Sequence, residues 1–140
     1  FEVSEVLWIE NMDVKIPYEG RKYICNVTDC FTLVRDVYRY TFNIDFGTHP
    51  RPPDWQSWNK HYIDSKFKEL GFVEVNQKDL QSYDVILMQI RSTSSNHIAL
   101  YLEDGIILHH LHNRSSTKDS LNRWLPFVTR YLRYAKKELS

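Results

Sequence analysis

The strongest periodic pattern in the sequence begins at Cys30. From there the apolar residues are spaced for one face of a helix: Leu33, Val34, Val37 and Tyr38. Thr28 and Asp29 come directly before this stretch, and both side chains can accept hydrogen bonds from the free amides of a first helical turn. The pattern therefore predicts a helix that begins at a cysteine and ends near Phe42.

A second apolar stripe with helical spacing covers residues 55–70, and Gly71 follows it as a typical helix end. Beyond Gly71 the pattern changes to short apolar runs rich in β-branched residues, which predict strands. These runs cover residues 72–75, 84–90, 97–102, 106–111 and 124–134. Asp104 and Gly105 lie between two of them and are a strong local signal for a β-hairpin. Helices followed by an antiparallel meander predict an α+β fold, with the N-terminal helices packed on the sheet.

We interpret the whole chain, residues 1–140, as a single domain. Residues 1–14 carry short apolar patches without a strong period, and we expect them to form a peripheral lead-in. Residues 46–53 contain three prolines, which exclude a helix or a sheet interior and predict a loop that walls a cleft or connects two elements. The chain starts at Phe1 rather than at a methionine, which favours a domain of a longer protein.

Composition excludes several classes of protein. The 140 residues are 42% hydrophobic and 14% aromatic, which is incompatible with overall disorder. Eighteen basic residues balance eighteen acidic ones, and this balance argues against nucleic acid as the main partner. No apolar run approaches the roughly 18 residues of a membrane span, and no signal peptide is visible.

The position of Cys30 is the first indication of chemistry. The positive end of a helix dipole favours a thiolate, which is the nucleophilic form of cysteine. Two interpretations remain open from this position alone: a nucleophile, or a buried cysteine that packs like a small apolar residue. Cys25 lies in the loop before the helix, and we expect both cysteines to be reduced because nothing else in the sequence demands a bridge.

A general base for this thiol is predicted on the hairpin. With the turn at residues 104–105, residues pair when their numbers sum to about 209, so that His97 faces a position near residue 112 and His109 a position near residue 100. The sequence does not fix the parity across the turn, but both histidines can lie at the same mouth of the sheet. There His97 would take the thiol proton and later protonate the leaving amine, while His109 would hold the ring of His97 in one tautomer.

A zinc site is the competing interpretation of the same residues. Its ligands would come from Cys25, Cys30, His109, His110 and His112. Their spacing does not match the usual Cys-x2-4-Cys or His-x3-5-His pattern of structural zinc, so we predict no metal and no other cofactor. Neighbouring strand residues point to opposite faces, so His110 cannot share a site with His109, and we expect His110 and His112 to be surface histidines, like His49 and His61.

Three segments resemble the NlpC/P60 family of cysteine peptidases. Asp29–Val34, Asp-Cys-Phe-Thr-Leu-Val, is similar to the family's Asp-Cys-Ser-Gly-Leu-Val helix motif, with Phe-Thr in place of Ser-Gly. Asn96–Leu102 resembles the family's histidine strand, and Ile107–His109 resembles the end of the strand that carries its third polar residue. The likeness covers roughly residues 15–134, and it is closer to the branch found in tail-tip proteins of tailed phages.

This resemblance implies a papain-like α+β fold and a catalytic triad of Cys30, His97 and His109. It implies a substrate or oxyanion role for Asp29 and for a tyrosine upstream of the cysteine, which matches Tyr18, with Tyr23 as the alternative. The implied reaction is hydrolysis of stem peptides of bacterial peptidoglycan, often between D-glutamate and a diamino acid.

In a virion tail tip, this activity would open the cell wall for DNA entry and act in the wall or the periplasm, alongside other tail-tip proteins. Two further interpretations stay open. One is a thiol acyltransferase or amidase on the same scaffold, and the other is a structural tail domain without catalysis.

Overall fold

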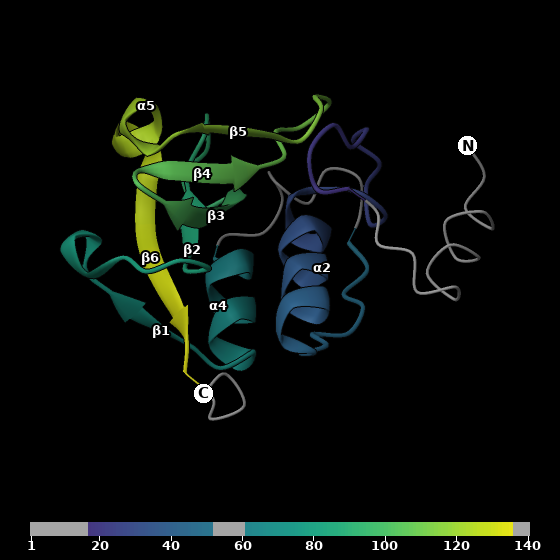
Figure 1. Ribbon diagram of the computed structural model, residues 1–140, viewed down its shortest axis with the longest axis horizontal. Helices are drawn as coiled ribbons and strands as arrows, with labels where there is room; N and C mark the ends of the chain where they lie inside the picture. Colours follow the sequence, from purple (N-terminus) through teal and green to yellow (C-terminus); the bar gives the residue numbers. More distant parts are fainter. Residues whose placement is uncertain (1–16, 52–60, 136–140) are drawn as a thin grey trace.

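The computed structural model describes residues 17–51 and 61–135, and in this part of the chain an antiparallel sheet is combined with helices (Figure 1). The six strands lie in the order β1-β6-β2-β3-β4-β5, and all five pairings are antiparallel. They are β1 Phe72–Val75, β2 Val85–Met88, β3 His97–Glu103, β4 Ile106–His109, β5 Thr117–Ser120 and β6 Val128–Tyr134. The helices are α2 Cys30–Phe42, α4 Tyr62–Glu69, α5 Leu121–Trp124 and the 3-10 turns Gln77–Asp79 and Leu125–Phe127. The predicted α+β class with an antiparallel sheet is confirmed.

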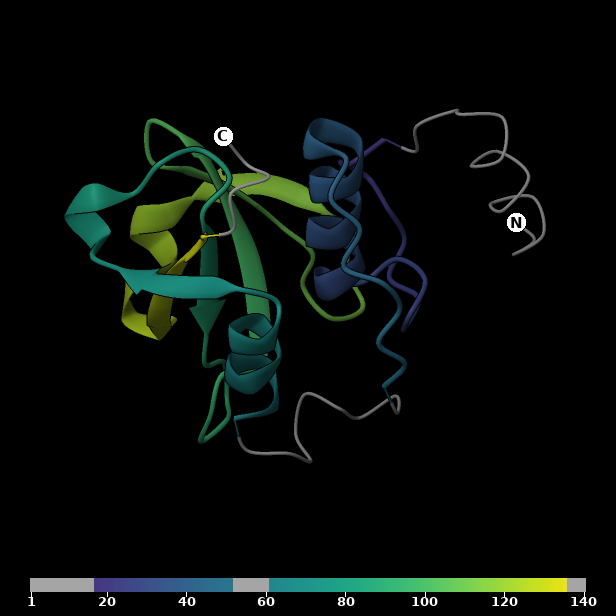
Figure 2. The same ribbon diagram turned by 90° about the horizontal axis from the view of Figure 1, so that it is seen from below.

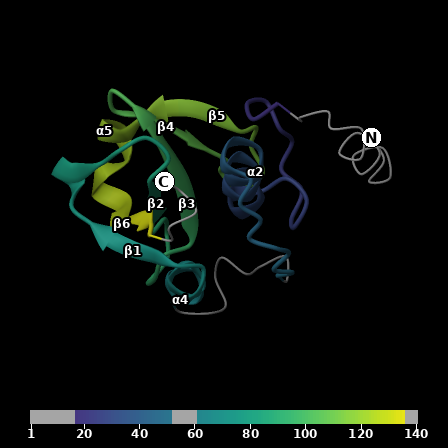
Figure 3. The ribbon, with the colours of Figure 1, turned by 60° about the horizontal axis from the view of Figure 1, so that its bottom comes forward.

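Two apolar clusters cover the two faces of the sheet. The larger one joins α2 and α4 to one face, through residues such as Val34, Phe67 and Leu100. The smaller one lies on the other face, where Ala99 packs with Leu121 of α5. Figure 3 shows α2 and α4 together beside the sheet, with α5 beyond its other side, and Figure 2 shows the same arrangement from below. The N-terminal helices therefore pack on the sheet as predicted.

Helix α2 begins and ends where the sequence predicts, at Cys30 and Phe42. Asp29 is the N-cap: its carboxylate accepts a hydrogen bond from the Thr32 amide at 2.9 Å, and the Thr32 hydroxyl accepts one from the Asp29 amide at 2.7 Å. This reciprocal capping box satisfies two amides that the first turn leaves free. Asn43 ends the helix in the left-handed conformation, with φ of +57°.

The predicted helix over residues 55–70 is not continuous. His61 has φ of +64°, and α4 starts directly after it, at Tyr62. The end of α4 agrees with the sequence, because Leu70 caps the helix and Gly71 follows with φ of +99°, a conformation that favours glycine. Residues 52–60 and the predicted lead-in, residues 1–14, lie outside the described residues.

The order of the strands corrects the predicted meander. Only β2 to β5 follow one another in the sheet; the last strand, β6, lies between β1 and β2. It begins at Val128 rather than at the predicted residue 124, because residues 121–127 form short helical turns. The edge strand β5 was not predicted, because its sequence, Thr-Lys-Asp-Ser, has none of the apolar alternation that marks a half-buried strand.

The predicted hairpin is present, but its register is shifted by one residue. Ala99 faces His109, so the two numbers sum to 208 in this part of the ladder. A bulge between Tyr101 and Glu103 absorbs the extra residue. Because side chains alternate along a strand, His97 and Ala99 share a face, and His109 opposite Ala99 shares it too.

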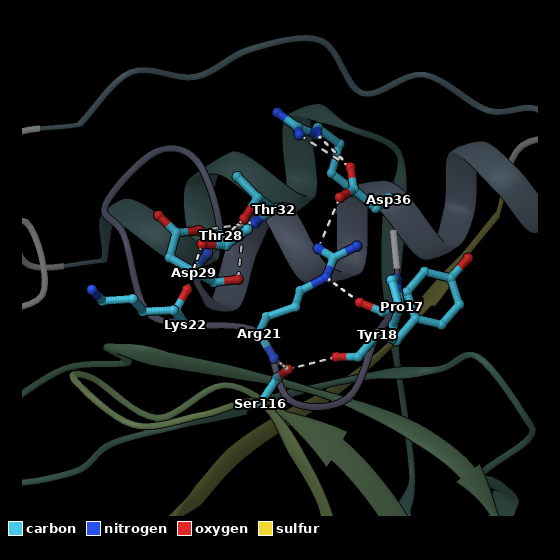
Figure 4. A network of polar contacts seen from close by, with 10 residues as sticks. Pro17, Tyr18, Arg21, Lys22, Thr28, Asp29, Thr32, Asp36 and Ser116 are labelled. Carbon is cyan, nitrogen blue, oxygen red and sulfur yellow. Dashed lines mark hydrogen bonds and ion pairs between the residues drawn. The ribbon is translucent and has the colours of Figure 1, made fainter. Parts of the chain in front are cut away.

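A buried ion pair holds the N-terminal segment against α2. The Arg21 guanidinium donates to Asp36 on α2 at 2.8 Å, and both side chains are almost fully buried. The Arg21 amide donates to the hydroxyl of Ser116, which in turn donates to the Tyr18 carbonyl (Figure 4). These contacts fix α2 relative to the loop that follows β4.

No helix in residues 17–51 and 61–135 combines the length and the apolar character needed to cross a membrane.

Candidate active site

Cys30 is the first residue of α2, and its side chain is buried, with 2% of the residue exposed. The backbone amides of Ile98 and Phe31 hydrogen-bond its sulfur. Ile98 follows His97 directly on β3, so the packing of α2 on β3 brings the thiol to the strand that carries the predicted base. In the described part of the chain no hydrogen bond joins the thiol to the His97 ring.

The protonation state of Cys30 differs from the sequence-based expectation. Burial, reinforced by the Asp29 carboxylate, raises the pKa of Cys30 to about 12, although Arg51 and the two backbone amides act in the opposite direction. Loss of solvent around the sulfur therefore outweighs the helix dipole. At neutral pH the resting group is a thiol, and its activation requires a base.

The two predicted histidines lie side by side. Nε2 of His97 is 3.0 Å from Nδ1 of His109, and the ring centroids are 5.1 Å apart. His97 is 5% exposed and His109 is fully buried. The structure thus brings together the base and the orienting partner that the sequence predicts, on neighbouring strands and on one face of the sheet.

The His97 ring is suited to act as a neutral base. Burial, followed by the neighbouring His109 and His110, lowers the pKa of His97 to about 3. The imidazole is therefore uncharged at neutral pH and has a lone pair available for the thiol proton. Cys30 and His97 are therefore both uncharged at rest, rather than a thiolate and an imidazolium.

A carboxylate that sequence reasoning missed extends this pair. Asp119 on β5 places Oδ2 at 3.5 Å from Nε2 of His109, and its carboxylate accepts hydrogen bonds from the Trp124 indole and the Ser120 amide, each at 2.8 Å. The residue opposite His109 on β5 is Thr117, so Asp119 is its diagonal neighbour on the same face. The only signal in the sequence was an acidic residue in a polar segment, which does not reveal its register.

Asp29 is fully buried, and other groups of the protein bind its carboxylate. Besides capping Thr32, it accepts a hydrogen bond from the Asn26 amide at 2.7 Å and forms an ion pair with Arg51 at 2.9 Å. These contacts assign Asp29 the task of fixing the start of α2, and hence the position of Cys30. The implied substrate or oxyanion contact of Asp29 stays a prediction.

The structure separates Tyr18 from Cys30. Tyr18 lines a groove with Val37 and Thr41, two turns or more along α2 from the cysteine. Figure 4 shows Tyr18 near Asp36, at the other end of the contact network from Asp29. The alternative, Tyr23, packs edge-on against His110 and His112, with ring centroids 5.1 and 4.8 Å apart.

His110 is not the surface histidine that the sequence predicts. It is fully buried, and its Nε2 donates to the Arg114 carbonyl at 2.8 Å, while its Nδ1 has no hydrogen-bond partner among the described residues. The chain folds back after β4, and Tyr23 covers the ring. Burial lowers the pKa of His110 more than the hydrogen bond to the Arg114 carbonyl raises it.

A small pocket adjoins the cysteine. Its lining includes Phe31 and Ile98, which flank the thiol, and the side chains of Arg51 and Lys66. Phe31 and Thr32 stand where the family motif has Ser-Gly: Phe31 fills space in this pocket and Thr32 completes the capping box. Within residues 17–51 and 61–135, no three His, Cys, Asp or Glu side chains are placed to hold a metal ion. Both cysteines are free thiols.

Known proteins match this chain in sequence and in fold. The model of the NlpC/P60 family matches residues 16–133. The tail tip assembly protein K of Escherichia phage lambda is 34% identical over 101 residues, which cover 71% of this chain and 50% of that protein. The protein of the same name from Escherichia phage N15 is 29% identical over 108 residues, which cover 74% of this chain and 43% of that protein. The chain thus spans about half the length of the curated relatives it matches.

A solved structure shares the fold. The NlpC/p60 domain of peptidoglycan hydrolase SagA superposes with a TM-score of 0.55 and 18% sequence identity, over 83% of this chain and 89% of that one. The family match extends over most of the sequence and includes α2 and every strand except the last residue of β6. This chain belongs to the NlpC/P60 family.

Proposed function

We propose that this domain is a cysteine peptidase that hydrolyses stem peptides of bacterial peptidoglycan. The observation that carries the proposal is the placement of Cys30 at the capped start of α2 and against β3. His97 on this strand has its Nε2 3.0 Å from Nδ1 of His109 on β4. Family membership supports the same chemistry, and one solved relative is named a peptidoglycan hydrolase.

The reaction follows from the protonation states of the two groups. His97 takes the proton from the Cys30 thiol, and the sulfur attacks the carbonyl carbon of the scissile peptide bond. The imidazolium of His97 then gives its proton to the leaving nitrogen, which leaves the acyl group on sulfur as a thioester. Water, deprotonated by the now neutral His97, hydrolyses the thioester and restores the thiol.

The names of the curated relatives suggest where this domain acts. Because the curated relatives are named tail tip assembly proteins, we place this domain in a virion tail tip, next to other tail proteins, where it would open the cell wall for DNA entry. We further propose that the chain forms one domain of a longer protein, as the partial coverage of these relatives suggests.

The name of those relatives also favours a second candidate, a structural part of the tail that needs no catalysis. Digestion of purified peptidoglycan separates the two functions. The peptidase releases stem-peptide fragments and the Cys30→Ala variant does not, whereas a purely structural domain releases none and binds its tail partners equally well with or without the thiol. Transfer to an added amine in place of water would instead identify an acyltransferase.

A further inference from the structure

We propose that Asp119 is a positioning residue that sets the tautomer of His109 and, through it, the tautomer of His97. This inference rests on the proposed function, since it explains how the base of that reaction is prepared. Asp119 does not contact the thiol and lies on a different strand from both histidines.

The first step is the contact between the Asp119 carboxylate and the His109 ring. The carboxylate of Asp119 can only accept hydrogen bonds when ionised, and it lies 3.5 Å from Nε2 of His109, an ion-pair distance. Hydrogen bonds from Trp124 and Ser120 lower the pKa of Asp119 despite the opposing effect of burial, so the carboxylate is ionised at neutral pH. An acceptor at this position favours the proton of His109 on Nε2.

In the second step, the tautomer of His109 determines the tautomer of His97. A neutral His109 with its proton on Nε2 has a bare Nδ1, which can only accept. Nδ1 of His109 lies 3.0 Å from Nε2 of His97, so the proton of His97 must be on Nε2. The remaining nitrogen of His97, Nδ1, then carries the lone pair, and it is the atom left to take the thiol proton.

The groups around His109 leave Asp119 as the acceptor for its Nε2 proton. The charged or titratable groups that act on it are His97 from β3, Asp119 from β5, Arg123 from α5 and the adjacent His110. Among them only Asp119 can act as an anionic acceptor, and Arg123, 3.8 Å from the same carboxylate, stabilises its ionised form. The Trp124 ring packs edge-on against His109 with centroids 5.2 Å apart, which limits rotation of the imidazole.

The test compares Asp119→Asn with Trp124→Phe. The asparagine keeps the size of the side chain but offers a donor as well as an acceptor, so His109 is no longer restricted to one tautomer. The phenylalanine keeps an aromatic ring against His109 and removes only the indole donor to Asp119. It therefore controls for a merely structural role of the Asp119 cluster.

Two readouts do not depend on hydrolysis. Nitrogen NMR of histidine-labelled protein should show His97 and His109 each protonated on Nε2 in the wild type and in Trp124→Phe, and mixed tautomers in Asp119→Asn. The alkylation rate of Cys30, measured in a Cys25→Ser background, should fall by at least about tenfold in Asp119→Asn near neutral pH and by less than about threefold in Trp124→Phe.

On a stem peptide, Asp119→Asn should lower kcat by at least about tenfold and leave KM within about twofold. Unchanged tautomers and unchanged alkylation in Asp119→Asn would overturn the proposal, as would an equal loss in Trp124→Phe. If the wild type hydrolyses no stem peptide, the proposed function fails, whereas the tautomers and the alkylation rates still decide the role of Asp119.

Discussion

The ring nitrogens Nε2 of His97 and Nδ1 of His109 lie 3.0 Å apart, although the two residues are on different strands and twelve positions apart in the chain. A bulge in the β3–β4 hairpin is responsible. Without the extra residue between Tyr101 and Glu103, His109 would face Leu100, whose side chain points to the opposite face of the sheet. The bulge therefore brings the predicted base and its predicted partner together.

We expect the histidines to differ in their effect on hydrolysis. His97→Ala should lower kcat by at least about a hundredfold, because it removes both the base for the thiol and the acid for the leaving amine. His109→Ala should cost less, since His109 only orients the His97 ring. The rates of the purified variants on one defined stem peptide check this order.

His110→Ala serves as the matched comparison. Its Nε2 binds the Arg114 carbonyl rather than the His97 ring, so we expect little loss of kcat, with a loss of stability because the ring is buried. A His110 variant as inactive as the His97 variant, with His109→Ala near normal, would mean that the site uses the other face of β4.

The sequence was most informative where local chemistry decides the structure. Helix α2 starts and ends at the predicted residues because a capping box and a left-handed Asn43 are local features. The hairpin turn at Asp104 and Gly105 is likewise local, and both residues have the positive φ that this dipeptide favours. The predicted positions of Cys30, His97 and His109 depend on this helix and this hairpin.

Features that depend on long-range packing could not be predicted. The place of β6 between β1 and β2, the bulge near Tyr101 and the diagonal position of Asp119 all depend on register between strands. The pKa of Cys30 depends in the same way on burial by distant residues, which a helix start does not reveal. The short motif favours Tyr18 over Tyr23; Tyr18 lines a groove with Val37 and Thr41, whereas Tyr23 packs against His110 and His112.

The ion pair between Asp29 and Arg51 should be important for stability. Asp29→Ala removes the cap of α2 and leaves the Arg51 charge buried, so we expect the free energy of unfolding to fall by about 3–5 kcal/mol. Glu19→Ala breaks the exposed pair with Lys118 and should cost less than about 1 kcal/mol. Urea denaturation of the two variants makes the comparison, and equal effects would contradict a structural role for the buried pair.

Stability should fall on acidification. The pKa of His97 is lowered to about 3 in the folded protein, whereas an unfolded histidine titrates near 6.5, so below about pH 6.5 the unfolded chain binds the extra proton. This one group should lower the free energy of unfolding by about 1.4 kcal/mol per pH unit between those two values, and it has no effect above them. His109 and His110, whose pKa values are also lowered by burial, act in the same direction.

Urea denaturation between about pH 7.5 and 4.5 measures this slope. The His97→Gln variant is the control, because it lacks the titrating ring and should show a shallower slope by about one proton. An identical slope in wild type and variant would mean that the folded His97 binds its proton as an unfolded histidine does.

Activity should depend on the thiol and not on a metal. EDTA should leave hydrolysis unchanged, because in the described residues no cluster of metal-binding side chains faces the site, while iodoacetamide should abolish it. Loss of activity with EDTA and its rescue by zinc would contradict a thiol mechanism.

The most direct test is digestion of purified peptidoglycan, followed by mass spectrometry of the released fragments. The wild type and Cys25→Ser should release fragments cut within the stem peptide, because Cys25 lies in the loop before α2, 3.9 Å from the Arg51 carbonyl. Cys30→Ala should release at least about a thousandfold less, with the fold intact by circular dichroism. Fragments from Cys30→Ala at the wild-type rate, or loss of activity in Cys25→Ser alone, would contradict the assignment of Cys30 as the nucleophile.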